Sequence, residues 1–237
     1  ADGMGGYNAG EVASGMATMY LSTELEADFA KRSPSDVDSA TGQRYAQRCL
    51  QDRIAATNSA IFHAAESQPQ YAGMGTTLVT ALFSDNTVTV AHLGDSRFYL
   101  LRGETFSAVT RDHSLLQEQI DSGMITAQEA RFSQNKNLVT RALGVDPAVE
   151  PEIHDYPVLP GDIYLLCSDG LNDMVEDEEI GMALQMLSAN LELAATQLIQ
   201  MANDNGGRDN VSVILVKILR DFPAPQGWWS KCLRWLG

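Results

Sequence analysis

The chain has 237 residues, with 31 acidic against 16 basic side chains and a net charge of −15. This length suits one full-sized domain, which can bury about three-quarters of its unfolded surface without disulfides or a structural metal. The negative charge argues against non-specific binding to nucleic acids or anionic membranes, because both need the opposite sign. The carboxylates are either a solvated surface or, in part, a cage for cations, and composition leaves both open.

Cysteine usage and the start of the chain bear on the compartment. Cys49, Cys167 and Cys232 form no CxxC pair, so neither a disulfide framework nor a zinc knuckle is expected and a reducing cytoplasm fits best. No run of about 18 apolar residues occurs, which predicts no transmembrane segment. The start at 1–6 lacks the basic and apolar regions of a signal peptide and an initiator Met. We interpret the chain as processed, trimmed or without a preceding segment.

The first half of the chain predicts two helices followed by strands. Apolar residues at three-to-four spacing indicate helices over 10–29 and 44–66, joined by a loop. The period then changes to two, and Asp85-Asn86 is typical of a hairpin turn. Short strands with tight turns predict one antiparallel meander. Its strands are expected at 76–84, 87–93, 97–102 and 106–110.

The second half adds helices and two more strands. A helical signal over 114–134 includes Thr126 and Glu129, which fit a capping box. The apolar segment 163–167 predicts a short strand, and 211–218 is apolar enough for a buried strand. Runs of strands and helices, rather than strict alternation, indicate an α+β fold in which helices cover both sides of a sheet sandwich. The later helices are expected at 177–187 and 191–202.

Three short motifs place an aspartate beside Gly or Asn in a turn. Gly lets the backbone bend and exposes carbonyl groups, and carboxylate oxygens are the hard ligands that Mg²⁺ and Mn²⁺ prefer. Each motif alone is more typical of an ordinary turn. Their occurrence in order, together with Gly94-Asp95-Ser96-Arg97, favours a metal site. The motifs are Asp2-Gly3-Met4-Gly5-Gly6, Ser168-Asp169-Gly170-Leu171 and Gly207-Arg208-Asp209-Asn210.

These motifs, with Gly75-Thr76-Thr77 and Asp112-His113, resemble the metal-dependent serine/threonine protein phosphatases, the PPM or protein phosphatase 2C family, of bacterial type. The resemblance reaches to about Ile218 and is specific only for the motifs taken together. It implies a four-layer αββα sandwich, in which two antiparallel sheets are flanked by helices. The implied domains are a catalytic domain over 1–219, with a flap at about 115–143, and a Trp-rich tail over 220–237.

The same resemblance implies a site for two Mn²⁺ or Mg²⁺ ions. Asp2 bridges both ions, the Gly3 carbonyl binds one, and Asp169 and Asp209 complete the other. A third, weaker ion is expected at Asp112 together with Asp169. Asp2, Asp169 and Asp209 are then catalytic through the metal-activated water that bridges the two ions and attacks phosphorus in line. Such charge stabilisation suits phosphomonoester hydrolysis, which is extremely slow without a catalyst.

The sequence departs from the family pattern in two places. The expected N-terminal strands, with a phosphate-binding Arg and an acidic metal ligand, do not precede Asp2. If the protein begins at Ala1, weak or no activity and reduced stability are expected. If preceding residues were trimmed, the full enzyme is expected to be normal. Met4 stands where some members have a His that is a candidate general acid. Because Met cannot donate a proton, protonation of the leaving group is expected from water on a metal ion.

Several other residues allow more than one interpretation. We interpret His92 as structural, His113 as a candidate second-shell residue, and Arg97 as the partner of a nearby carboxylate. Cys167 is expected to be inert core. Asp173, four residues after Asp169, is a candidate for the outer shell of the site. The flap cations fit either contact with a phosphopeptide or simple surface charge; they are Arg131, Lys136 and Arg141.

The tail over 226–237 contains all three tryptophans together with Lys231 and Arg234. It fits either a short amphipathic contact with a partner or membrane surface, or packing back on the domain. The predicted function is hydrolysis of phosphoserine and phosphothreonine in phosphorylated proteins by a cytoplasmic monomer, as the counterpart of a bacterial serine/threonine kinase. One alternative is a catalytically impaired pseudophosphatase or partner-binding module with the same fold. Another is a phosphatase dedicated to one regulatory partner.

Overall fold

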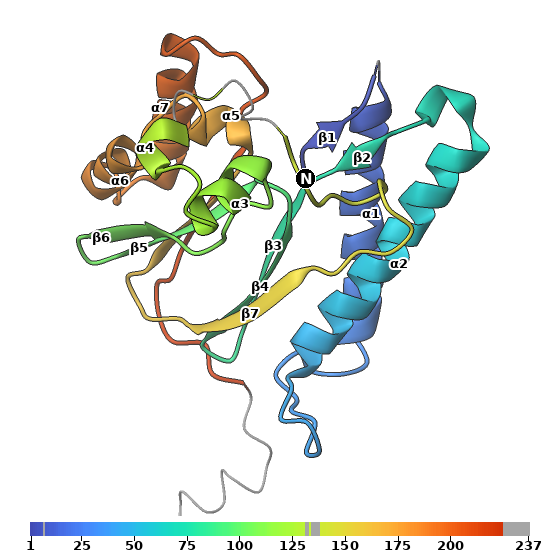
Figure 1. Ribbon diagram of the computed structural model, residues 1–237. Helices are drawn as coiled ribbons and strands as arrows, with labels where there is room; N and C mark the ends of the chain where they lie inside the picture. Colours follow the sequence, from blue (N-terminus) through green and yellow to red (C-terminus); the bar gives the residue numbers. More distant parts are fainter. Residues whose placement is uncertain (7, 131–132, 134–137, 225–237) are drawn as a thin grey trace, which may run out of the picture.

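Two antiparallel sheets form the centre of the computed structural model, which describes residues 1–6, 8–130, 133 and 138–224 (Figure 1). The first sheet has the order β3-β4-β7 and the second β6-β5-β8-β9, while β1 and β2 pair separately. The strands are β1 (Gly3–Met4), β2 (Gly75–Thr76), β3 (Leu78–Ser84), β4 (Thr87–Leu93), β5 (Arg97–Arg102), β6 (Thr105–Ala108), β7 (Glu152–Pro157), β8 (Ile163–Cys167) and β9 (Val213–Lys217).

Helices cover the outer face of each sheet. The long helices α1 (Ala9–Phe29) and α2 (Tyr45–Ser67) share a core cluster with residues of β3 and β4. On the other side, α6 (Asp177–Met186) and α7 (Leu191–Asp204) pack with residues of β5 and β8. A third cluster joins the two sheets through residues that include Val90, Phe98 and Tyr164. The predicted four-layer sandwich is therefore confirmed, with shorter helices at its edges: α3 (Leu115–Asp121), α4 (Ala127–Ala130), α5 (Asp169–Asn172) and the 3₁₀ turn η1 (Pro69–Tyr71).

The predicted single meander is wrong, because the chain changes sheets between β4 and β5. The change occurs at Gly94, whose φ of +97° belongs to the region that glycine favours. A Cβ there would lie 2.7 Å from Thr77 Cγ2, so a larger residue would clash. The neighbour of β4 is instead β7, which pairs with it from Thr87↔Pro157 to His92↔Glu152.

Three further expectations need correction. The helical signal over 114–134 divides into α3 and α4, with a break at Gly123, whose φ is +72°. The predicted capping box is confirmed within it, since the Thr126 N–H donates to Glu129 Oε2 at 2.7 Å. Strand β9 lies at a sheet edge rather than in the interior, and Ile214 is 60% exposed. The turn expected at Asp169 is the short helix α5.

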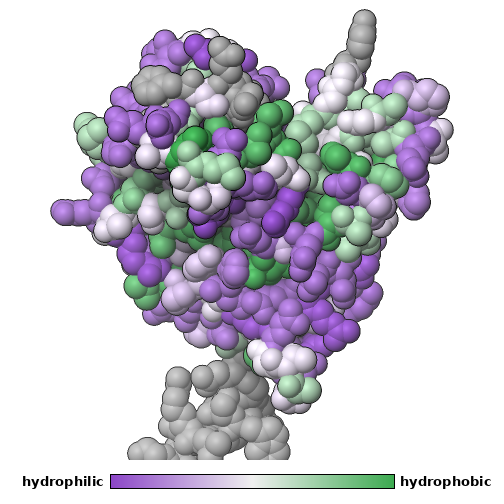
Figure 2. Space-filling model, viewed as in Figure 1, coloured by the Kyte–Doolittle hydropathy of each residue, from purple (hydrophilic) through white to green (hydrophobic). Residues whose placement is uncertain are grey.

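The described residues include no helix that is both long and apolar enough to span a membrane. The face drawn in Figure 2 is mainly hydrophilic, as the net charge of −15 leads one to expect. Arg131, Lys136 and the predicted Trp-rich contact over 226–237 lie outside the described residues.

Candidate active site

Backbone hydrogen bonds fix Asp2 beside the start of β3. The Asp2 N–H donates to Thr77 Oγ1 and the Thr77 N–H donates to the Asp2 carbonyl, both at 2.9 Å. Thr76 Oγ1 donates to the same carbonyl at 2.8 Å. The Thr77 hydroxyl also lies 2.8 Å from the Ser96 hydroxyl, so Asp2 is tied to the turn that carries Asp95.

Gly3 follows Asp2 at a point where two backbones nearly touch. A Cβ on Gly3 would lie only 2.0 Å from the Gly10 carbonyl oxygen, so no other residue fits without displacing α1. Gly3 also pairs with Thr76 in the short sheet formed by β1 and β2. The position of the Gly3 carbonyl is therefore set by both α1 and β2.

Asp169 and Asp209 are brought together by contacts between their own motifs. Ser168 Oγ donates to the Asn210 carbonyl and accepts from the Ser212 N–H, both at 3.0 Å. A Cβ on Gly170 would lie 2.3 Å from the Asn210 carbonyl oxygen, so glycine lets the two segments approach this closely. As a result α5 presents Asp169 beside the loop that carries Asp209.

The aspartates of these segments form one acidic cluster, defined as Asp2, Asp95, Asp169, Asp173 and Asp209. Burial, together with the charges of Asp95, Asp2 and Asp173, raises the pKa of Asp169 to about 8. Burial also raises the pKa of Asp95 to about 6, with help from the charge of Asp112. The pKa of Asp2 is raised by burial and by the charge of Asp209, although a hydrogen bond with Asp169 opposes this.

The cluster fits divalent cations. Asp169 Oδ1 is buried and has no hydrogen-bond partner, an arrangement that costs free energy unless another ligand satisfies the atom. Neighbouring carboxylates repel one another, and a divalent ion among them would offset that repulsion. Every candidate metal ligand in the cluster is a hard carboxylate oxygen, which suits Mg²⁺ or Mn²⁺.

Asp112 lies beside this cluster but is held by a guanidinium. Arg97 Nε donates to Asp112 Oδ1 at 2.8 Å and Nη2 donates to Oδ2 at 2.7 Å. The prediction that Arg97 pairs with a carboxylate is confirmed. Arg97 Nη1 also donates to the Tyr99 hydroxyl at 3.0 Å, and that hydroxyl donates to Asp177 Oδ1 at 2.9 Å.

Asp95 is the residue of the cluster that the sequence interpretation left without a role. Its motif was recognised, but periodicity and spacing do not reveal which way a side chain in a turn points. In the structure Asp95 is 8% exposed, and after burial the charges of Asp112, Asp173 and Asp2 raise the pKa of its carboxyl group. The assignment of a third ion to Asp112 stays a prediction.

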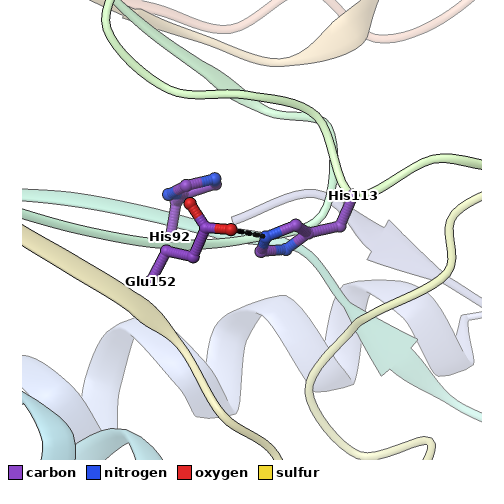
Figure 3. A group of neighbouring side chains, drawn as sticks. All are labelled: His92, His113 and Glu152. Carbon is purple, nitrogen blue, oxygen red and sulfur yellow. Dashed lines mark hydrogen bonds and ion pairs between the residues drawn. The ribbon is translucent and has the colours of Figure 1, made fainter. Parts of the chain in front are cut away.

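A second group of possible metal ligands, His92, His113 and Glu152, has ligand atoms within 4.8 Å of one another (Figure 3). The Gly94 N–H donates to His113 Nδ1 at 3.3 Å, so the ring carries its proton on Nε2, which lies 3.2 Å from Glu152 Oε1. That tautomer leaves no lone pair for a metal on Nε2. His92 Nε2 lies 2.9 Å from the Arg111 carbonyl, which confirms its interpretation as a hydrogen-bonded core residue.

This histidine group supports the turn that carries Asp95. The His113 N–H donates to the Gly94 carbonyl at 2.9 Å, and the rings of His92 and His113 stack at 4.7 Å. His113, which follows Asp112 in the chain, is therefore bonded to Gly94, which precedes Asp95. It is not itself a member of the acidic cluster. Arg141, the described flap cation, has Nη1 4.0 Å from Glu152 Oε1.

The αββα sandwich with its acidic cluster fits an enzyme that uses divalent metal ions, and comparison with known proteins identifies the family. Residues 2–211 match the family model described as protein phosphatase 2C. A serine/threonine phosphatase stp of Listeria innocua is 39% identical over 217 residues, which cover 92% of this chain and 82% of that protein. A PstP of Mycobacterium tuberculosis is 40% identical over 219 residues, 40% of its own length.

Solved structures agree with these sequence matches. The crystal structure of the M. tuberculosis serine/threonine phosphatase PstP/Ppp has a TM-score of 0.82 at 38% identity, covering 92% of this chain and 86% of that chain. The PstP catalytic domain in complex with two manganese ions has a TM-score of 0.78 at 38% identity, covering 92% and 85%. The chain belongs to the protein phosphatase 2C family, and its enzyme class is that of a metal-dependent phosphoprotein phosphatase. The resemblance drawn from the motifs is confirmed.

Proposed function

We propose that this protein hydrolyses phosphoserine and phosphothreonine in proteins, using two divalent ions held in the acidic cluster. The observation that carries the proposal is a buried carboxylate oxygen without a hydrogen-bond partner, Asp169 Oδ1, in a cluster where Asp169 bonds to Asp2 and the charge of Asp209 acts on Asp2. The names of the relatives, serine/threonine phosphatases, support the substrate class. The manganese complex of a similar catalytic domain supports two ions.

In this proposal the chain positions the ions and takes no covalent part in the reaction. Asp2, the Gly3 carbonyl, Asp169 and Asp209 would hold the two ions. When bound, Mn²⁺ or Mg²⁺ would neutralise phosphate charge and lower the pKa of a water molecule at the site. The contacts of Asp2 with Thr77 and of Ser168 with Asn210 keep the carboxylates in place.

A third ion is also part of the proposal. The sequence prediction places it at Asp112 with Asp169. The charges of Asp95 and Asp173 both act on Asp169, which supports including these two carboxylates. The two hydrogen bonds from Arg97 would orient the Asp112 carboxylate.

The proposal is tested by hydrolysis of an aryl phosphate and of a phosphothreonine peptide, with and without Mn²⁺. Asp169→Asn and Asp209→Asn are each expected to abolish turnover and to weaken Mn²⁺ binding measured by calorimetry. Asp36→Asn, an exposed carboxylate paired with Arg32, is the matched control and should change neither. Hydrolysis that persists in Asp169→Asn at saturating Mn²⁺ would contradict the proposed site.

The biological setting is proposed from the same relatives. The protein would act in the cytoplasm as a monomer and oppose a serine/threonine kinase, with residues 1–219 as the catalytic domain and 220–237 as a tail that contacts a partner or membrane surface. Among the described residues nothing favours the pseudophosphatase alternative, because the three aspartates proposed as metal ligands are all present. Lack of hydrolysis under all metal conditions would favour that alternative.

A further inference from the structure

Glu152, the first residue of β7, is linked by its side chain to the histidine that follows Asp112 (Figure 3). Glu152 Oε1 lies 3.2 Å from His113 Nε2, which carries the ring proton and donates it. Burial opposes the charge of Glu152, but the hydrogen bond from His113 holds the pKa of Glu152 below its ordinary value. Glu152 is therefore an ionised acceptor for this ring at neutral pH.

The acceptor on one side of the His113 ring decides what the other side can bind. A neutral imidazole has one N–H and one lone pair. Because the proton lies on Nε2, facing Glu152, Nδ1 keeps its lone pair and accepts the Gly94 N–H at 3.3 Å. His113 is only 6% exposed, so the loss of Glu152 would remove a strong acceptor from a buried N–H. A proton on Nδ1 would then place two N–H groups opposite each other at Gly94.

The turn that carries Asp95 depends on this ring. His113 binds both backbone groups of Gly94, since the His113 N–H also donates to the Gly94 carbonyl at 2.9 Å. Gly94 has a φ of +97° and lies where the chain leaves the first sheet for the second. Asp95 follows directly and is buried. A change at Gly94 would therefore alter the direction of the Asp95 side chain.

The same histidine pair holds the chain on both sides of Asp112. His92 Nε2 lies 2.9 Å from the Arg111 carbonyl, and the rings of His92 and His113 stack at 4.7 Å. Arg111 precedes Asp112 and His113 follows it. A change in the His113 ring would thus act on the backbone that presents Asp112.

The backbone around His113 is fixed independently of its ring. The Thr140 N–H donates to the His113 carbonyl at 2.8 Å, and Ser114 pairs with Val139. The backbone of Glu152 is likewise held by the pairing of β7 with β4. A change of the Glu152 side chain leaves these backbone bonds in place. Its effect is therefore expected at the ring and at the turn, with the path of the chain preserved.

We propose that Glu152 is a positioning residue that acts through His113. By selecting the ring tautomer that accepts the Gly94 N–H, it keeps Asp95 and Asp112 in place for a divalent ion beside the acidic cluster. Glu152 itself contacts neither an ion nor the substrate in this proposal. The inference rests on the proposed function, because an ion at Asp112 is part of that proposal.

Three variants, each of which removes one negative charge, separate hydrogen bonding from charge. Glu152→Ala removes the acceptor, whereas Glu152→Gln keeps a carbonyl oxygen at the same reach for the His113 N–H. Glu150→Ala changes an exposed carboxylate two residues earlier and is the control for net charge. Urea unfolding of the metal-free chains checks that each variant is folded before the other measurements.

The first measurement is NMR of the histidine ring nitrogens in the metal-free full chain. The parent chain, Glu152→Gln and Glu150→Ala are expected to carry the His113 proton on Nε2. Glu152→Ala should show a mixture of tautomers, with shifted amide signals at Gly94 and Asp95. An unchanged His113 ring in Glu152→Ala would overturn the proposal. This readout needs no hydrolysis, so it decides the role of Glu152 even if a lack of turnover in the parent chain contradicts the proposed function.

The second measurement is the Mn²⁺ concentration that gives half-maximal turnover. Glu152→Ala is expected to raise it about tenfold, the lower end of the range for lost support around a metal site. Glu152→Gln and Glu150→Ala should match the parent chain. Calorimetry should still detect two ions in Glu152→Ala, because the other aspartates are intact. An equal rise in Glu152→Gln and Glu152→Ala, or no rise in Glu152→Ala, would overturn the proposal.

Discussion

An aspartate lies near each end of strand β8, and the two carboxyl groups differ in their hydrogen-bond partners and in their pKa. Asp162, just before the strand, is 2% exposed, and Arg102 Nε and Nη2 donate to its two oxygens at 2.8 and 2.7 Å. Burial opposes its charge, but these bonds hold the pKa of Asp162 below its ordinary value. Asp169, just after the strand, has a pKa raised to about 8 by burial and an oxygen without a partner.

The difference separates an aspartate that stabilises the fold from one that is kept ready for a ligand. The oxygens of Asp162 are also bonded by the Leu159 N–H at 2.8 Å and the Tyr164 hydroxyl at 3.0 Å, so nothing further can be bound there. Asp169 is instead surrounded by other carboxylates. Burial alone therefore does not distinguish the two aspartates, whereas the unpartnered oxygen Asp169 Oδ1 does.

The largest expected effect is the loss of activity in Asp169→Asn. Hydrolysis should fall by more than about 100-fold, because loss of a residue that merely supports a metal ligand already costs about 10- to 100-fold. The metal-free variant should unfold at no lower urea concentration than the parent chain, because the ionised Asp169 carboxylate is disfavoured by burial and by the charges of Asp95 and Asp2. The measurements are initial rates at saturating Mn²⁺ and urea unfolding in EDTA. A clear loss of metal-free stability in Asp169→Asn would show that Asp169, like Asp162, stabilises the fold.

For Asp162→Asn we expect a loss of stability without a loss of activity. The free energy of unfolding should fall by about 2 kcal/mol, because hydrogen bonds to a buried charge are worth about 1.5–3 kcal/mol and Arg102 is partly solvated. Turnover per folded molecule should not change. Urea unfolding, with activity normalised to the folded fraction, checks both statements. A drop in turnover without a loss of stability would mean that the two ends of β8 are not independent.

The sequence predicts some turns and strands of the fold correctly and misses others. Asp85 and Asn86 both have positive φ, at 53° and 52°, as expected for a tight hairpin of the type their sequence favours. In contrast, β7 was missed because its sequence, Glu-Ile-His-Asp-Tyr-Pro, is polar and ends in proline. Such a strand is fixed by its pairing with β4 rather than by local propensity.

The site residues were predicted from sequence motifs. What the motifs did not predict is the role of Asp95 and the partner of Arg97, because both depend on the folded chain. Asp2, Asp169 and Asp209 stand beside glycine or asparagine in motifs that resemble those of a known family, and that resemblance implied a common site. Asp95 could not be assigned because its direction depends on the change of sheet at Gly94. The pairing of Arg97 with Asp112 was expected only as a pairing with some carboxylate, since spacing does not name the partner.

A smaller effect is expected for Asp112→Ala, which tests the prediction of a third ion. Turnover at saturating Mn²⁺ should fall about tenfold, the range found when groups around a metal site are lost. Two ions should still bind in calorimetry, because Asp2, Asp169 and Asp209 are intact. Arg97→Gln leaves Asp112 without its guanidinium and should give the same direction of change. Unchanged turnover in Asp112→Ala would contradict the role of this carboxylate.

The smallest expected effects come from removing two tyrosine hydroxyls. One lies in the network of Arg97 and Asp112, and the other donates to Asp162. Tyr99→Phe removes the hydroxyl between Arg97 and Asp177, and Tyr164→Phe removes a donor to Asp162. Both side chains are buried, so each variant should lose about 1 kcal/mol of stability, the usual value of one hydrogen bond. Only Tyr99→Phe should also raise the Mn²⁺ concentration needed for half-maximal turnover, because Arg97 then holds Asp112 less firmly. Equal Mn²⁺ requirements in the two variants would show that the Arg97 network serves the fold alone.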